Sequence, residues 1–273
     1  MAPPPAPAGR DVPQPRWWGT LLYVPLLYGI GWLAVRPLSW LLPSWRVDQV
    51  DLAGVLVAFL LLLLSLPSRL RRAWGEGRPW RRLGVHRSPG RLLRSWLAGV
   101  GLALSLLTGV TLLLLLSGQA RWQANLSPAE LLNGVALLVG VGFAEELLFR
   151  GWLWGELEMR LEPRPALLLQ AALFAALHPW HQLGGLAAVA LFGGLMLLGL
   201  ALALQRRSDG GSLWGAIGLH GGLVGGWFLL CQGGLQLGAA VPAWLIGPQQ
   251  NPVGGLPGWL GLTLLLLLKR RWW

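Results

Sequence analysis

The stretch "GFAEELLFRGW", residues 142–152, places three ionisable side chains inside an otherwise apolar run. Residues 131–144 carry no charge, and then Glu145, Glu146 and Arg150 follow within six residues. A charged side chain near the centre of a bilayer is costly, and such residues usually pair with one another or mark a functional site. The stretch therefore predicts a membrane helix that carries a polar centre.

The composition of the whole chain predicts an integral membrane protein. Of its 273 residues, 54% are hydrophobic and only 12% are charged, whereas soluble domains usually carry about a quarter charged residues. Apolar runs of about 20 residues are typical of membrane-spanning helices. The apolar stretches cover residues 17–35, 49–67, 95–117, 130–149, 165–180, 184–204, 212–231 and 256–268. We therefore expect an all-α polytopic transmembrane bundle of about eight spans.

Composition also divides the chain into four segments. Residues 1–16 hold six prolines and no apolar periodicity, which predicts a disordered tail. Residues 17–129 contain the first three apolar stretches and an arginine-rich connection at 69–94. Residues 130–231 contain the next four stretches, with the polar side chains discussed below. Residues 232–273 form a loop and the last stretch.

Positive charge is concentrated in alternate connections. Residues 69–94 contain nine arginines and one acid, and the chain ends "LKRRWW". The fourth and sixth connections contain Arg160, Arg164, Arg206 and Arg207, whereas Arg121 is the one Lys or Arg of the third, fifth and seventh connections. Because Lys and Arg are enriched in cytoplasmic loops, both termini are expected to be cytoplasmic. The net charge of +11 therefore indicates topology and contact with membrane lipids, and we expect no nucleic-acid partner.

The spacing of the polar residues gives each of them a direction. Glu146 and Arg150 are four residues apart, so they share a helix face and can form an ion pair. Glu145 lies about 100° around the helix and lacks that partner. The histidines of the fifth and seventh stretches, His178 and His220, are the partners available to it.

Each of these features has a structural explanation when taken alone. A Glu–Arg pair can lock two helices together, and a buried histidine can satisfy a hydrogen bond within a bundle. One unpaired glutamate and two histidines on the only stretches with polar cores favour a functional centre instead.

Three motifs in this region resemble those of the CPBP family of intramembrane proteases, which includes the CAAX prenyl protease 2 type and lysostaphin resistance protein A-like members. "EELLFR" at 145–150 is similar to the motif EExxxR, and "FAALH" at 174–178 is similar to FxxxH. The third motif is a histidine followed four residues later by a polar residue. It falls at His220, with Val224 in the polar position. The resemblance covers residues 130–231 and implies a bundle of about eight helices.

The resemblance also implies roles in peptide hydrolysis. Glu145 and His178 would activate a water molecule, and His220 would stabilise the oxyanion. Glu146, Arg150 and Phe174 would support these three side chains. Phe174 stands four residues before His178, where its ring can wall the imidazole. No serine lies beside these histidines, and Cys231 lies three turns beyond His220, so a covalent nucleophile is disfavoured.

Two questions stay open at this point. Glu145, His178 and His220 could together bind Zn²⁺ and leave its fourth position for water, or they could act without metal. The substrate is expected to be a membrane-associated protein or peptide, approached from the cytoplasmic side because Glu145 would lie near the inner end of its span. The alternative is a non-catalytic scaffold or immunity-type member of the same fold, which Val224 would favour.

Overall fold

The computed structural model describes residues 14–273, so residues 1–13 of the expected tail lie outside the described part. The chain divides into two compact units, Met1–Arg82 and Leu83–Trp273. In unit one, α1 (Trp17–Val35) and α3 (Val47–Trp74) form a helical hairpin. A Cβ atom on Gly31 would lie 2.5 Å from the Gly54 carbonyl oxygen, so these helices pack backbone to backbone. The short helices of this unit are α2 (Leu38–Leu41) and α4 (Pro79–Arg82).

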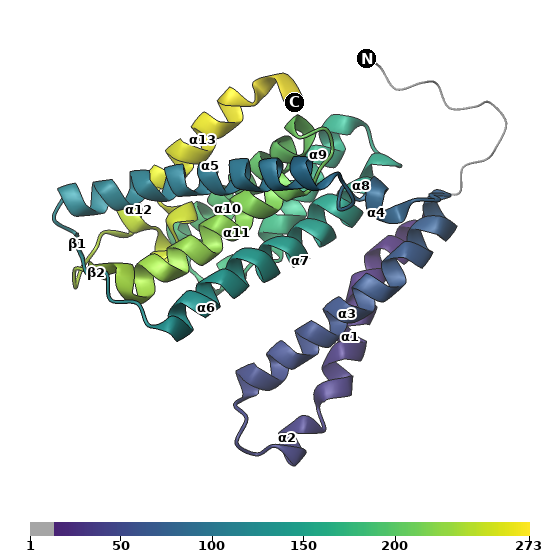
Figure 1. Ribbon diagram of the computed structural model, residues 1–273, viewed down its shortest axis with the longest axis horizontal. Coiled ribbons are helices and arrows are strands. Elements are labelled where there is room, and N and C mark those ends of the chain that lie inside the picture. The colour runs from purple at the N-terminus through teal and green to yellow at the C-terminus, as the bar shows by residue number, and fades with distance from the viewer. Residues whose placement is uncertain (1–13) are drawn as a thin grey trace. The chain divides into compact units, whose positions relative to one another are not determined.

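Unit two contains the motifs, and its helices are built around α11 (Figure 1). The long helices are α5 (Pro89–Leu116), α10 (Gly185–Ser208) and α11 (Trp214–Leu229). One continuous helical run, Pro128–Glu158, consists of α6 (Pro128–Ala136), α7 (Gly142–Glu146) and α8 (Trp154–Glu158) joined by π-helical turns at Leu137–Val141 and Leu147–Leu153. The shorter elements are α9 (Pro163–Ala176), α12 (Ala243–Ile246) and α13 (Leu256–Leu268), with 3₁₀ turns at Pro179–Gln182, Pro248–Gln250, Pro252–Gly254 and Arg270–Trp272 and a π turn at Leu230–Gly234.

The fold is the expected all-α polytopic bundle, with a difference in the number of long helices. Within residues 14–273, six helices are long and apolar enough to cross a membrane, and α13 is a shorter apolar helix. The stretch expected at 165–180 forms the 14-residue α9, which reaches only about 21 Å. Proline at position 179 explains this early end, because the residue before proline avoids helical backbone.

Glycine also allows α5 and α11 to approach closely. A Cβ atom on Gly99 would lie 2.1 Å from the Gly215 carbonyl oxygen, and one on Gly218 would lie 2.3 Å from the Trp96 carbonyl oxygen. Small residues of this kind are common where membrane helices meet. The contact fixes α11, and therefore His220, against α5.

A small two-stranded sheet, which the sequence did not indicate, joins two connections at one end of unit two. β1 (Ala120–Trp122) pairs antiparallel with β2 (Leu235–Leu237), with Ala120 opposite Leu237. Figure 1 shows this sheet and α12 at the end of the unit opposite to α8.

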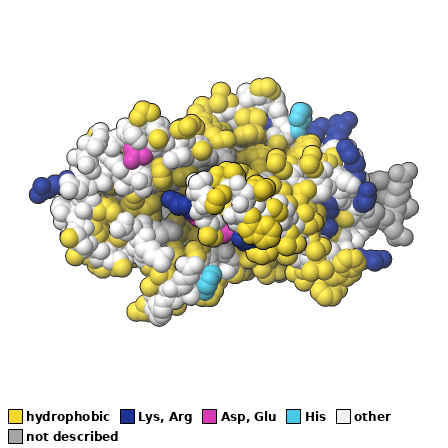
Figure 2. Space-filling model, turned by 90° about the horizontal axis from the view of Figure 1, so that it is seen from below, with side chains coloured by type: hydrophobic (Ala, Val, Ile, Leu, Met, Phe, Trp, Pro, Cys, Tyr) yellow, Lys and Arg dark blue, Asp and Glu magenta, His cyan; other side chains and the backbone are white. Residues whose placement is uncertain are grey.

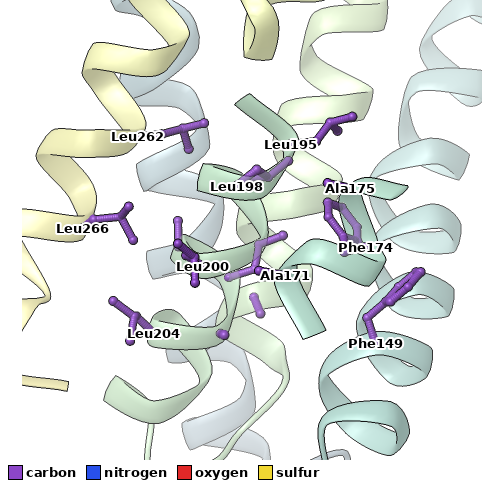
Figure 3. Close-up of a cluster of buried hydrophobic side chains, with 14 of the residues drawn as sticks. Phe149, Ala171, Phe174, Ala175, Leu195, Leu198, Leu200, Leu204, Leu262 and Leu266 are labelled. Carbon is purple, nitrogen blue, oxygen red and sulfur yellow. The ribbon is translucent and has the colours of Figure 1, made fainter. Parts of the chain in front are cut away.

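The hydrophobic core of unit two lies where α9, α10 and α11 meet. Figure 3 shows Phe174 and Ala171 of α9 directed toward leucines of α10, with Phe149 beside them. The Phe149 and Phe174 rings pack edge to face, with 5.1 Å between their centroids. Many leucines on the outer helix faces are exposed, and hydrophobic side chains cover much of the face in Figure 2. A surface of this kind suits contact with lipid, and the protein is a multi-pass integral membrane protein.

Candidate active site

Glu146 is at the centre of a buried polar network. Its carboxylate and the Arg150 guanidinium are both fully buried, and Arg150 Nη1 donates to Glu146 Oε1 over 2.8 Å. The Nδ1 atom of His220, 74 positions further along the chain, lies 2.8 Å from the same oxygen. An ionised carboxylate only accepts hydrogen bonds, so His220 donates its Nδ1 proton to Glu146. The predicted Glu146–Arg150 pair is present, and it also orients His220.

The sequence predicted a helical stretch over residues 165–180 that would contain His178. In the structure α9 ends at Ala176, so His178 lies just after the helix. Its backbone is extended (φ −90°, ψ 159°), because Pro179 follows it. Phe174 therefore offers its carbonyl oxygen to His178 Nδ1, 2.7 Å away, instead of to a helical N–H. Since a carbonyl oxygen only accepts, the proton sits on Nδ1 and Nε2 keeps a lone pair. The Phe174 ring also packs against this imidazole, with 4.5 Å between the centroids.

Glu145 faces both imidazoles. Its Oε2 atom lies 3.7 Å from His178 Nε2 and 3.9 Å from His220 Nε2. Within residues 14–273, this buried oxygen has no hydrogen-bond partner. Glu145 Oε2 and His178 Nε2 are thus two acceptors that face each other, an arrangement that a water molecule can bridge by donating one hydrogen to each. The structure brings together the three side chains expected from the sequence, from α7, the end of α9 and α11.

A cavity of about 490 Å³ reaches these imidazoles. Its deep part is lined by His178, His220 and Phe174, with leucines of α10 and α11 around them. Val224 also lines it, so the position where the resemblance expects a polar side chain supplies no donor. The amide side chains of Gln232, Gln249, Gln250 and Asn251 line the opposite part.

The expected position of Glu145 near the inner end of the fourth span is wrong, whereas the side of approach stays a prediction. It assumed that this span ends near residue 149, whereas the helical run continues to Glu158 and Glu145 lies near its middle. The cavity extends from His220 along α11 toward residues 249–253. That direction leads away from Arg206 and Arg207, which lie just before the start of α11.

The donor types at the site would suit Zn²⁺, but their placement does not. Ligand atoms about 2.0–2.1 Å from a tetrahedral zinc lie about 3.3–3.4 Å from one another, which is shorter than the 3.7 Å and 3.9 Å measured here. Within residues 14–273, no group of three or more His, Cys, Asp or Glu side chains is placed to hold a metal ion.

Two supporting polar residues, Gln170 and Glu156, were not predicted from the sequence. Gln170 was missed because only ionisable side chains were considered in the expected spans. Gln170 is fully buried in α9, and its Nε2 donates to the Gly199 carbonyl oxygen, which Arg150 Nη2 also contacts. A lone glutamine in "ALLLQAALF" was the available signal. Glu156 is buried and accepts from Trp152 Nε1 over 2.7 Å; it was missed because the span was ended too early.

Comparison with known families gives one match within each unit. Residues 127–225 match the family described as "Type II CAAX prenyl endopeptidase Rce1-like". Residues 4–78 match "Domain of unknown function (DUF8676)". No curated protein and no solved structure gives a significant match. The Rce1-like match contains Glu145, His178, His220 and Val224.

Proposed function

Because residues 127–225 form an Rce1-like type II CAAX prenyl endopeptidase domain of the CPBP type, we propose that this protein hydrolyses a peptide bond of a membrane-associated substrate. The observation that carries the proposal is the approach of Glu145 Oε2 to the Nε2 atoms of His178 and His220, at 3.7 Å and 3.9 Å. At 3.7 Å one water molecule can hydrogen-bond to Glu145 and to His178 together, and a general base can act through one such water.

Water activation is the first step. A water molecule held between Glu145 and His178 Nε2 transfers a proton to the Glu145 carboxylate as its oxygen attacks the carbonyl carbon. His178 is suited to hold the water because its Nδ1 proton is engaged by Phe174, so its Nε2 atom accepts. Glu145 later returns the proton to the leaving amine, as a single acid–base group does in peptide hydrolysis.

Stabilisation of the oxyanion is the role of His220. As an imidazolium it donates Nδ1–H to Glu146, 2.8 Å away, and Nε2–H to the developing oxyanion. The fully buried Arg150 guanidinium and Glu146 carboxylate offset each other's charge, which lowers the cost of placing them in the membrane. Arg150 and Glu146 are positioning residues, since they act through His220.

The test is cleavage of membrane-anchored fluorogenic peptides by the purified protein in lipid nanodiscs. Glu145→Gln should slow turnover by about 10²–10⁴-fold, the contribution of a general base. The matched control is Glu162→Gln, because Glu162 is exposed just before α9; it should retain full activity. Equal activity of the two variants would contradict the proposal. A parent chain that cleaves no peptide would favour the scaffold alternative that Val224 suggests.

The same assay tests whether activity depends on a bound metal ion. Because the three side chains are too far apart for zinc as they are placed, activity should survive 1,10-phenanthroline. Loss of activity that added Zn²⁺ restores would show that the side chains move together around a metal, and would replace the metal-free step.

A further inference from the structure

The cavity that reaches the candidate active site extends from the two histidines toward one end of unit two. Starting from His220, its wall follows Val224 and Trp227 along α11 and then Cys231 in the π turn that follows. It ends at residues 249–253, in the connection that begins with β2. Figure 1 shows β2 and α12 at one end of this unit.

The opposite end is closed by packed side chains. Arg150, Glu146, Gln170 and Phe174 have no exposed surface. Beyond them, Arg206 donates to the carbonyl oxygen of Arg150 and covers that end of the site. A peptide therefore has no path to His220 from this side without unfolding the core.

Basic residues mark the closed end. The connections and terminal helical turns at that end contain Arg160, Arg164, Arg206, Arg207 and the run Lys269–Arg271. At the open end, Arg121 on β1 is the one Lys or Arg of unit two within the described residues. Since Lys and Arg mark cytoplasmic connections, the open end is the non-cytoplasmic one.

The lining indicates what kind of peptide fits. Apart from the two histidines, the cavity has no ionisable side chain except the Cys231 thiol. The mouth carries amides from Gln232, Gln249, Gln250 and Asn251, which both donate and accept hydrogen bonds, as a peptide backbone does. Deeper in, leucines and aromatic rings replace them. A charged side chain would be buried there without a partner, at a high cost.

We propose that the site acts on the non-cytoplasmic side of the membrane, on an extended and uncharged peptide segment that enters through the amide-lined mouth. This inference rests on the proposed function for the cleavage step, and on the cavity and the charge distribution for the side of access. It reverses the side expected from the sequence.

Thiol labelling tests the side of access. Cys231 is the only cysteine, so Cys231→Ala gives a background without thiols. In that background Gln232→Cys places a thiol at the mouth, and Glu162→Cys places one at the closed end as the matched control. On intact cells, a membrane-impermeant maleimide should label Gln232→Cys and leave Glu162→Cys unlabelled; inverted vesicles should give the reverse. The opposite pattern would overturn the proposal.

A pair of reporters tests the substrate. Both are single-span proteins with the same uncharged apolar segment, placed on the non-cytoplasmic side in one and on the cytoplasmic side in the other. The first should be cleaved by the parent chain and not by Glu145→Gln, and the second should stay intact. Maleimide attached at Gln232→Cys should lower cleavage relative to the same variant before labelling, whereas maleimide at Glu162→Cys should not.

The outcomes separate the inference from the proposed function. Glu145-dependent cleavage of the cytoplasmic reporter alone would overturn the inference and leave the protease function in place. Cleavage of neither reporter, with Gln232→Cys labelled from outside, would support the side of access and count against proteolysis.

Discussion

At the scale of single residues, one carboxylate oxygen connects the ion pair to the site. Glu146 Oε1 accepts from Arg150 Nη1 and from His220 Nδ1, each over 2.8 Å. A buried pair of this kind adds little net stability when it is complete, but its loss leaves an uncompensated charge. Its main consequence here is orientation, because His220 cannot turn without giving up this bond.

Arg150→Met should lower the free energy of unfolding by about 3–5 kcal/mol, because it leaves the buried Glu146 carboxylate without the Arg150 guanidinium. Adding Glu146→Gln should recover part of that loss, since the unpaired charge is then removed. Denaturant unfolding in detergent micelles measures both. Arg164→Met, at an exposed arginine, is the control and should change little. Full additivity of the two substitutions would argue against the pair.

Val224→Asn should increase turnover. Val224 lines the cavity beside His220, and one oxyanion donor is worth about 2–4 kcal/mol of barrier height. The Val224 side chain faces the cavity and is only partly buried, so an amide at this position would not be buried without a hydrogen-bond partner. Val224→Leu, which changes volume without adding a donor, is the matched control in the peptide assay. Equal turnover of the two variants would show that the oxyanion does not form near this position.

At the scale of elements, the site depends on how helices end and how closely they pack. α9 stops at Ala176, and this end releases the Phe174 carbonyl that fixes the His178 tautomer. α11 is fixed against α5 by glycines. Both features come from a single residue type in the right place, proline in one case and glycine in the other.

Gly99→Ala should destabilise the contact between α5 and α11. Its Cβ would lie 2.1 Å from the Gly215 carbonyl oxygen, and overpacking of this kind costs about 1–3 kcal/mol or more. Gly101→Ala is the matched control on the same helix, because nothing lies within 4 Å of its Cβ. The control should be neutral or up to about 1 kcal/mol stabilising, since alanine favours helix. Thermal unfolding in detergent compares them; equal shifts would rule out the close contact.

At the scale of the whole molecule, the chain consists of two units, and each contains one family match. The core cluster that surrounds Phe174 draws all its residues from unit two, and the Rce1-like match lies entirely within it. Unit one corresponds closely to the second family match, at residues 4–78.

Residues 83–273 should therefore fold and cleave without unit one. Removing the α1–α3 hairpin takes away two spans, so the remaining helices keep their orientation. Truncation must keep Leu83 and Gly84, because Leu83 is fully buried and the Gly84 carbonyl accepts from the Leu213 N–H over 3.1 Å. Size-exclusion chromatography and the peptide assay check the result. Aggregation of the truncated chain would show that unit one is needed for folding.

Local patterns were enough to predict most of the long helices and the ion pair between Glu146 and Arg150. Apolar length located the spans, and the four-residue spacing of Glu146 and Arg150 predicted their contact. The approach of Glu145 to His178 and His220 was also inferred correctly. Ionisable groups within a membrane usually face the interior of the helix bundle and pair with one another.

The sequence by itself thus determined the fold class and that Glu145, His178 and His220 lie together. Only the tertiary structure decided that His220 also binds Glu146, that β1 pairs with β2, and that the cavity opens toward residues 249–253. The physical reason is separation along the chain. The first two features join segments 74 or more positions apart, where neither helical period nor local charge specifies which surfaces meet. The direction of the cavity depends in addition on where α9 ends and how the last connection folds against α10, which packing alone decides.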